Sequence, residues 1–149
     1  MNERLKYRIW DKKAKSYTNS IGYPGASFHC VSNYYLSPDG EIVDFVTTIG
    51  GNQDDATKGP VDQDDYIVAF NTGMKDKNGI TIFEGDIVQY NQNSSYDNMN
   101  FIAKWSDDKL GFIFQSNSGD ELLNQTPHLN RFKHLEVVGN IFENPELLK

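Results

Sequence analysis

The chain has 149 residues, which is enough for one ordinary domain or two very small ones. Hydrophobic residues make up 38% of it, and nine Phe, eight Tyr and two Trp residues provide bulky side chains for a core. The net charge of −7 argues against a general nucleic-acid coat protein, because such proteins need a basic surface. A lone cysteine, Cys30, excludes an internal disulfide, and no apolar run approaches the ~20 residues of a membrane span. We therefore expect a cytoplasmic protein with no membrane partner.

The first predicted strand, residues 5–10, alternates apolar and polar residues and begins a basic segment. Six basic residues against two acidic residues give positions 1–15 a charge of +4, which leaves −11 for the rest of the chain. Arg4, Lys6 and Arg8 are candidate phosphate contacts, but pairing with acidic neighbours is the favoured interpretation. A turn after this strand predicts a hairpin partner at 16–18.

Two further strands, 28–37 and 41–46, flank the turn sequence Ser-Pro-Asp-Gly and are expected to pair antiparallel. Residues 50–65 are rich in Gly, Asn, Gln, Asp and Pro, which predicts a long acidic and polar surface loop or linker. An apolar run at 66–70 returns to regular structure. We therefore expect an N-terminal β-rich region at 1–70.

Residues 71–149 combine short strands with turns at Asp-Lys-Asn-Gly and Glu-Gly-Asp. This half resembles an SH3-like small barrel, in which coiled strands need glycines for bulges and close backbone approach. A short C-terminal helix is expected, with Asn144 as its cap and Pro145 as its first residue. The fold class is therefore mainly β, with little helix. The predicted strands of this half are 87–90, 101–105, 110–114 and 135–142, and one or two helical turns are expected at 119–123 and 128–133.

Four blocks along the chain resemble YopX-like phage and prophage proteins. They are KYRIWD at 6–11, TGMKDKNG at 72–79, IFEGDIV at 82–88 and GNIFENPELL at 139–148. The blocks occur in order over nearly the whole chain. The resemblance implies a bacteriophage or prophage origin, a small protein inside the bacterial host cell, and self-association. It implies no substrate.

The histidines do not form a metal-binding pattern. His128 and His134 are six residues apart, whereas zinc ligands usually occur in tighter pairs. His29 adjoins Cys30, but neighbouring strand residues point to opposite faces, so the two are poorly placed for nucleophilic catalysis. The acidic segment 62–65 lacks the glycine of a calcium loop, because Ile67 occupies the sixth position. No metal and no cofactor is predicted.

Glu84 and Asp86 flank a glycine, an arrangement that permits acid–base chemistry but more often forms a tight turn or bulge. The turn is the favoured interpretation. Neither a phosphate-binding loop nor a G-x-S-x-G sequence is present. The sequence therefore favours a non-enzymatic role, although it leaves the question of an enzyme undecided.

Aromatic residues of the predicted barrel are the last candidates for binding, because outward-facing rings stack on bases or clasp peptides. Alternation places Phe101 with Trp105 and Phe112 with Phe114, so core packing explains most of these rings. The candidate binding residues are Arg4, Lys6, Arg8, Tyr90, Tyr96 and Trp105.

Three functions follow from these patterns. The favoured one is a phage or prophage accessory protein that acts as a non-enzymatic β module and binds itself, as a homo-oligomer, or a host or phage protein. The first alternative is a nucleic-acid-associated accessory protein, which the net charge disfavours. The second is a metal-dependent hydrolase or nuclease that uses the clustered carboxylates.

Overall fold

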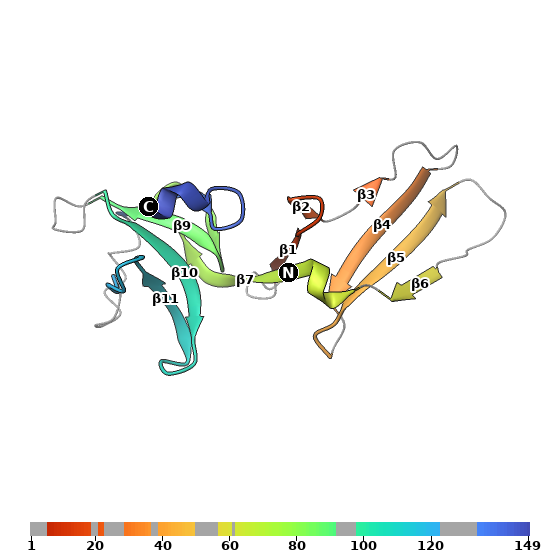
Figure 1. The fold of residues 1–149 in the computed structure, drawn as a ribbon, viewed down its shortest axis with the longest axis horizontal. Coiled ribbons are helices and arrows are strands. Elements are labelled where there is room, and N and C mark those ends of the chain that lie inside the picture. Colours follow the sequence, from red (N-terminus) through yellow and green to blue (C-terminus); the bar gives the residue numbers. More distant parts are fainter. Residues whose placement is uncertain are drawn as a thin grey trace. The chain divides into compact units, whose positions relative to one another are not determined.

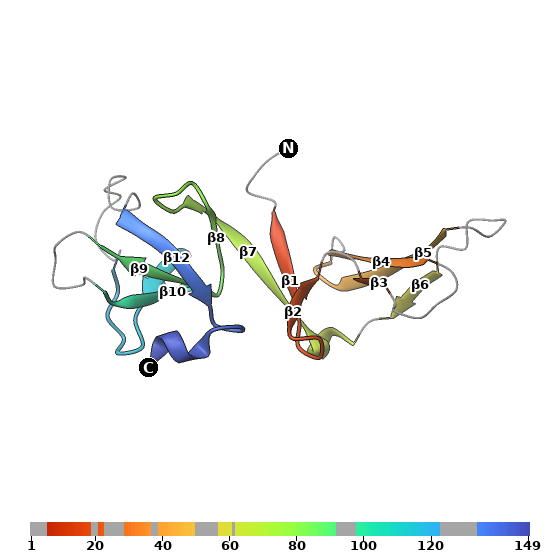
Figure 2. The same cartoon turned by 90° about the horizontal axis from the view of Figure 1, so that it is seen from above.

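The computed structural model describes residues 6–18, 21–22, 29–36, 39–49, 57–60, 62–91, 98–122 and 134–149. The chain divides into two compact units, and the strands of each can be followed in Figures 1 and 2. The N-terminal unit is Arg8–Val68, and the C-terminal unit is Ala69–Lys149 together with Met1–Tyr7.

The described residues are mainly β, as the sequence predicted, and no helix of seven or more residues occurs among them. The elements are β1 (Tyr7–Asp11), β2 (Ser16–Thr18), β3 (Ile21–Gly22), β4 (His29–Leu36), β5 (Ile42–Ile49), β6 (Thr57–Pro60), the 3-10 turn η2 (Gln63–Asp65), β7 (Tyr66–Lys75), β8 (Thr81–Phe83), β9 (Asp86–Tyr90), β10 (Asn100–Ser106), β11 (Gly111–Gln115), β12 (Leu135–Asn140) and the 3-10 turn η4 (Pro145–Leu148). They form three four-stranded sheets, in the orders β2-β1-β7-β8, β3-β4-β5-β6 and β11-β10-β9-β12. No described helix is long and apolar enough to cross a membrane.

The N-terminal unit contains the long hairpin predicted around the Ser-Pro-Asp-Gly turn. Strands β4 and β5 pair antiparallel from His29 opposite Ile49 to Leu36 opposite Ile42. The turn needs a left-handed residue, which Gly40 provides at φ 84°. The predicted hairpin of β1 and β2 is also present, with Trp10 opposite Tyr17.

The prediction of a loop over 50–65 is wrong in part. Strand β6 lies within this range and pairs antiparallel with β5, with Val43 opposite Pro60 and Val46 opposite Thr57. Its sequence, Thr-Lys-Gly-Pro, has no apolar alternation, so the pattern of the sequence did not indicate a strand there. The range also contains η2, which begins after Asp62, whose side chain accepts a hydrogen bond from the Asp64 N–H at 3.1 Å. Residues 50–56 and 61 lie outside the described part.

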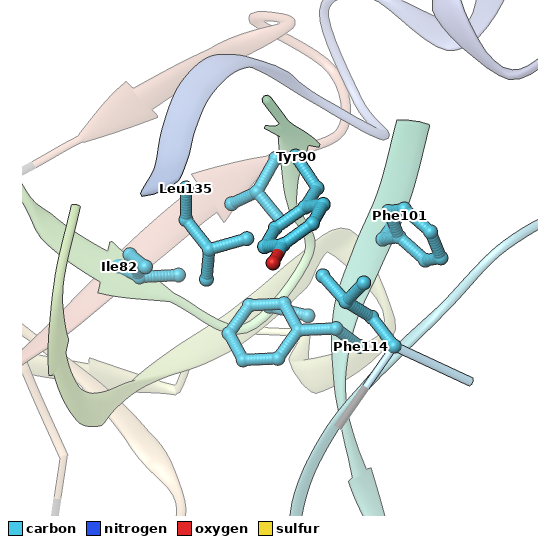
Figure 3. Packing of buried hydrophobic residues seen from close by; sticks show 8 residues of the cluster. Ile82, Tyr90, Phe101, Phe114 and Leu135 are labelled. Atoms are coloured by element: carbon cyan, nitrogen blue, oxygen red, sulfur yellow. The ribbon is translucent and has the colours of Figure 1, made fainter. Parts of the chain in front are cut away.

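The C-terminal unit contains a curled half-barrel made by the sheet β11-β10-β9-β12. Its core is a cluster of buried side chains from these strands, from β8 and from Leu122. Figure 3 shows Ile82, Tyr90, Phe101, Phe114 and Leu135 gathered between the strands. The predicted alternation is confirmed for β10, since Phe101 and Ala103 are both fully buried.

The last strand ends at Asn140 rather than at the predicted residue 142. Asn140 Oδ1 accepts hydrogen bonds from the backbone N–H groups of Phe142, at 3.0 Å, and Glu143, at 2.9 Å, so the side chain closes a turn there. The expected C-terminal helix is the 3-10 turn η4, and Pro145 begins it as predicted. Asn144 makes no side-chain capping bond to this turn.

The helical turn predicted at 119–123 is wrong for the described residues, because Glu121 forms a β-bridge with Gln115 instead. Residues 123 and 128–133 lie outside the described part.

Candidate binding site

The face of β10 and β11 that forms the core continues beyond it as an aromatic pair, Trp105 and Phe112, of which Trp105 is exposed and Phe112 half-buried. Trp105 follows Phe101 and Ala103 on β10, and Phe112 precedes Phe114 on β11, so alternation places all five side chains on one face. Trp105 nevertheless exposes 46% of its surface, because the hairpin extends past the buried cluster. Trp105 and Phe112 are cross-strand partners, with ring centroids 5.2 Å apart and ring planes at 81°.

The indole ring of Trp105 has a fixed orientation. Its Nε1–H donates to Asp107 Oδ1 at 3.0 Å, and its edge-to-face contact with Phe112 holds the other side of the ring. A large, rigid aromatic side chain loses little rotamer freedom when a partner covers it. Trp105 is therefore suited to act as an anchor for binding.

A hollow of about 500 Å³ lies beside this pair. It is lined by Phe70, Asn71, Glu84, Trp105 and Phe112, and we call these five residues the aromatic hollow. Phe70 of β7 is 45% exposed, so two large aromatic side chains reach solvent at one place. The volume lies in the range of ligand pockets.

Backbone hydrogen bonds bring the lining residues together. The Glu84 N–H donates to the Phe70 carbonyl at 2.8 Å, and the Gly85 N–H donates to the Ala103 carbonyl at 2.8 Å. The Gly85 carbonyl accepts from the Ile141 N–H at 2.9 Å, so this turn is attached to three other segments. Glu84 is thereby held against the aromatic pair.

Asp86 stabilises the same turn from inside. Its Oδ2 accepts a hydrogen bond from the Phe83 N–H at 2.8 Å, and the residue is 2% exposed. The Glu-Gly-Asp sequence therefore forms the turn that the sequence favoured. Only one of its two carboxylates, that of Glu84, faces the aromatic hollow.

The predicted aromatic candidates differ in their surroundings. Trp105 lines the aromatic hollow, whereas Tyr90 is 5% exposed and packs in the core, with its ring edge-to-face on His134 at 6.2 Å. Tyr96 lies outside the described residues. Of the three aromatic candidates, only Trp105 is therefore placed at the surface of the described structure.

Of the three predicted basic candidates, Lys6 and Arg8 belong to the described part of the chain. Lys6 is exposed and belongs to the C-terminal unit, whereas Arg8 is half-buried and belongs to the N-terminal unit. The Arg8 guanidinium lies 4.8 Å from the centre of the Tyr17 ring, in a cation–π contact. Arg4 lies outside the described residues.

Two lysines of the turn after β1 contact acidic residues of η2. Lys13 forms an ion pair with Asp65, and the Lys12 ammonium donates to the Asp64 carbonyl oxygen. The Lys12 backbone N–H also donates to the Asp65 carbonyl at 2.9 Å. The Lys13–Asp65 pair therefore neutralises one positive charge of residues 1–15 within the described part of the chain, whereas the acidic pairing expected for Arg4, Lys6 and Arg8 stays a prediction.

Sequence reasoning did not identify Phe70 or Asn71 as parts of a site, and it explained Phe112 by core packing. Phe112 shares the face of Phe114, so the alternation that marked it as a core residue also carries the signal for its place beside Trp105. Phe70 and Asn71 come from a different sheet, and no pattern in the sequence relates them to β10. In the described part of the chain, no three His, Cys, Asp or Glu residues are grouped so that they could hold a metal ion.

Fold and site together define a small mainly-β protein whose half-barrel carries an open aromatic hollow. The chain belongs to the YopX protein family, since the family model described as YopX protein matches residues 6–149. It is also similar to protein EF1440 from Enterococcus faecalis, whose crystal structure is 29% identical, has a TM-score of 0.51, and is matched over 97% of each chain. No match was found among curated proteins.

Proposed function

We propose that this YopX family member is a phage or prophage accessory protein that binds another protein, without catalysis, through the aromatic hollow. The observation that carries the proposal is the joint exposure of Phe70 and Trp105, at 45% and 46%, around one hollow. Exposed aromatic side chains that surround a concavity are typical of protein-binding surfaces.

The energetics support a protein partner. Covering roughly 100 Å² of each exposed ring at about 25 cal/mol per Å² contributes about 2–3 kcal/mol per ring. Two such rings around a hollow of about 500 Å³ supply the central anchors that binding a short peptide segment requires. The rim group Glu84 adds a polar contact that fixes the orientation of the segment.

The contacts of the basic segment favour this proposal over nucleic-acid binding. Lys13 already forms an ion pair with Asp65, which reduces the charge that it offers to phosphates, and the Lys12 ammonium already donates to a backbone carbonyl of η2. The net charge of −7 also disfavours binding to the phosphates of a nucleic acid. A second copy of the chain is one form of the protein partner, and the test below identifies it.

The test compares Trp105→Ala and Phe70→Ala with Leu110→Ala. Leu110 is 81% exposed on the same hairpin as Trp105 but does not line the aromatic hollow, so it is a matched apolar control. Each protein is used as bait in lysate of a bacterial host that carries the phage or prophage, and bound proteins are quantified by mass spectrometry. Light scattering on each purified protein measures self-association.

We expect the wild type and Leu110→Ala to share a partner, or to form the same oligomer, that both hollow variants lose. A partner found only by light scattering is a second copy of the chain. The proposal is contradicted if Trp105→Ala and Phe70→Ala retain the partner. It is also contradicted if the wild type is monomeric and captures the same proteins as both variants.

A further inference from the structure

The aromatic hollow carries a negative charge that no described basic side chain neutralises. Glu84 Oε1 accepts a long hydrogen bond, 3.5 Å, from the Trp105 backbone N–H. In the described part of the chain, no Lys or Arg forms an ion pair with Glu84. Lys109, from the turn after β10, pairs with Glu121 instead, and Lys104 lies on the opposite face of β10 from Trp105.

A second carboxylate increases the negative potential around the Trp105 ring. Asp107 Oδ1 accepts the indole N–H at 3.0 Å, and Asp107 is exposed and forms no ion pair with a described residue. The face of an indole ring attracts cations, and Trp gives the strongest cation–π contacts of the aromatic residues. Ring and carboxylates therefore favour the same kind of ligand group, a cation.

We infer that the aromatic hollow recognises an arginine side chain of the partner, with its guanidinium between the Trp105 ring and the Glu84 carboxylate. The inference rests on the proposed function, because it identifies the group that the bound segment presents. Arginine fits better than lysine, since its planar guanidinium stacks on an aromatic face and donates two parallel hydrogen bonds to a carboxylate. The guanidinium is also more weakly hydrated than an ammonium, so its transfer from water costs less.

The size of the hollow indicates that the arginine has an apolar neighbour. About 500 Å³ is more than one side chain fills, and Phe70 provides an apolar wall in addition to Trp105. An apolar residue next to the arginine would cover Phe70, while the arginine occupies the acidic end. The expected ligand is therefore a short peptide segment that contains an arginine and an adjacent apolar residue.

The test begins with selection of displayed random heptapeptides on the wild-type protein. Selected sequences are synthesised with arginine, lysine or citrulline at the basic position, and their dissociation constants are measured by fluorescence anisotropy. Citrulline keeps the shape of arginine without its charge. We expect arginine next to an apolar residue to be enriched, and citrulline to weaken binding about tenfold or more.

Variants of the protein separate the charge from the hollow. Glu84→Gln should weaken binding of the arginine peptide severalfold and leave the citrulline peptide unchanged. Asp107→Asn keeps an oxygen for the indole N–H and should weaken only the arginine peptide, to a smaller extent. Glu146→Gln changes an exposed carboxylate on η4 that does not line the hollow and should change neither. Trp105→Ala should abolish binding of both peptides.

The outcomes distinguish the two proposals. Peptides that need Trp105 but show no preference for arginine over citrulline would overturn the arginine inference and leave the proposed function intact. Equal losses for the two peptides in Glu84→Gln would also overturn it. Failure to select any peptide that depends on Trp105 would overturn the inference, while the lysate and light-scattering comparison decides the proposed function independently.

Discussion

The carboxylate of Asp76 accepts a hydrogen bond from the backbone N–H of Val137, 61 residues further along the chain, at 3.2 Å. The other oxygen of the same carboxylate accepts from the N–H groups of Asn78, at 2.8 Å, and Ile80, at 2.9 Å. Asp76 is buried, and one side chain thus joins the turn between β7 and β8 to the last strand. The Lys77 N–H, which donates to the Leu135 carbonyl at 2.8 Å, reinforces this junction.

We expect Asp76→Asn to lower the free energy of unfolding of the C-terminal unit by about 2–3 kcal/mol. The asparagine amide has one acceptor oxygen for the three backbone donors, and it lacks the charge that strengthens their hydrogen bonds. The measurement is urea unfolding followed by tryptophan fluorescence. Asp108→Asn changes an exposed turn carboxylate and should leave the midpoint in place. Equal midpoints for the two variants would show that the Asp76 bonds do not stabilise the unit.

Gly85 should tolerate alanine less well than Gly79. Both have φ 81°, where an alanine side chain is strained by about 1–2 kcal/mol, but a Cβ at Gly79 would meet no atom within 4 Å. A Cβ at Gly85 would lie 3.1 Å from Phe142 Cε2, and hydrogen bonds on both sides of the residue prevent the turn from moving away. We therefore expect Gly85→Ala to cost about 1 kcal/mol more than Gly79→Ala in chemical unfolding. Equal costs would contradict the packing at Gly85.

The contrast between Phe112 and Phe114 tests whether the hairpin contributes different parts to core and binding site. The two residues lie on one face of β11, but Phe114 is fully buried, whereas Phe112 is half-buried and lines the aromatic hollow. Phe114→Ala should lower the free energy of unfolding by about 3–5 kcal/mol, and Phe112→Ala by about 1–2 kcal/mol. Binding of the selected peptides, measured under conditions where both variants are folded, should be lost in Phe112→Ala and retained in Phe114→Ala. The opposite result for binding would place the site elsewhere.

The same hairpin shows how far the sequence predicts this molecule. Alternation alone assigned Phe101 and Trp105 to one face, and that assignment is correct. It carries no information on where the core stops, because the exposure of Trp105 depends on how far β10 extends past the cluster that covers Phe101. The length of a strand relative to its core is a property of the tertiary structure.

The approach of Glu84 to Phe70 was not predictable for a related reason. It depends on a backbone hydrogen bond between the turn after β8 and the middle of β7, and backbone pairing has no side-chain signature. The same reason explains why β6, a strand without alternation, was expected to be loop. Local turn chemistry was more informative, since the turns at Gly40, Gly79 and Gly85 were all expected from the sequence.

The ion pair of Lys13 with Asp65 predicts a dependence of stability on alkaline pH. The hydrogen bond from Lys13 to Asp65, followed by the attraction of that carboxylate, raises the pKa of Lys13 above its ordinary value of 10.5 in the folded chain. A group with a raised folded-state pKa contributes stability that is fully present below its unfolded-state pKa. The contribution is then lost as the pH increases through the folded-state value.

We therefore expect the difference in thermal midpoint between the wild type and Lys13→Gln to be constant from about pH 7 to pH 9, and to decrease above about pH 10.5. Lys15→Gln is the matched control, because Lys15 is an exposed lysine of the same turn. Its midpoint difference should show no comparable step. An NMR titration of the Lys13 Cε signal measures its pKa directly, and a value no higher than 10.5 would show that the ion pair does not persist in solution. The difference should also shrink at high salt, since both charges are near solvent and mobile ions screen them.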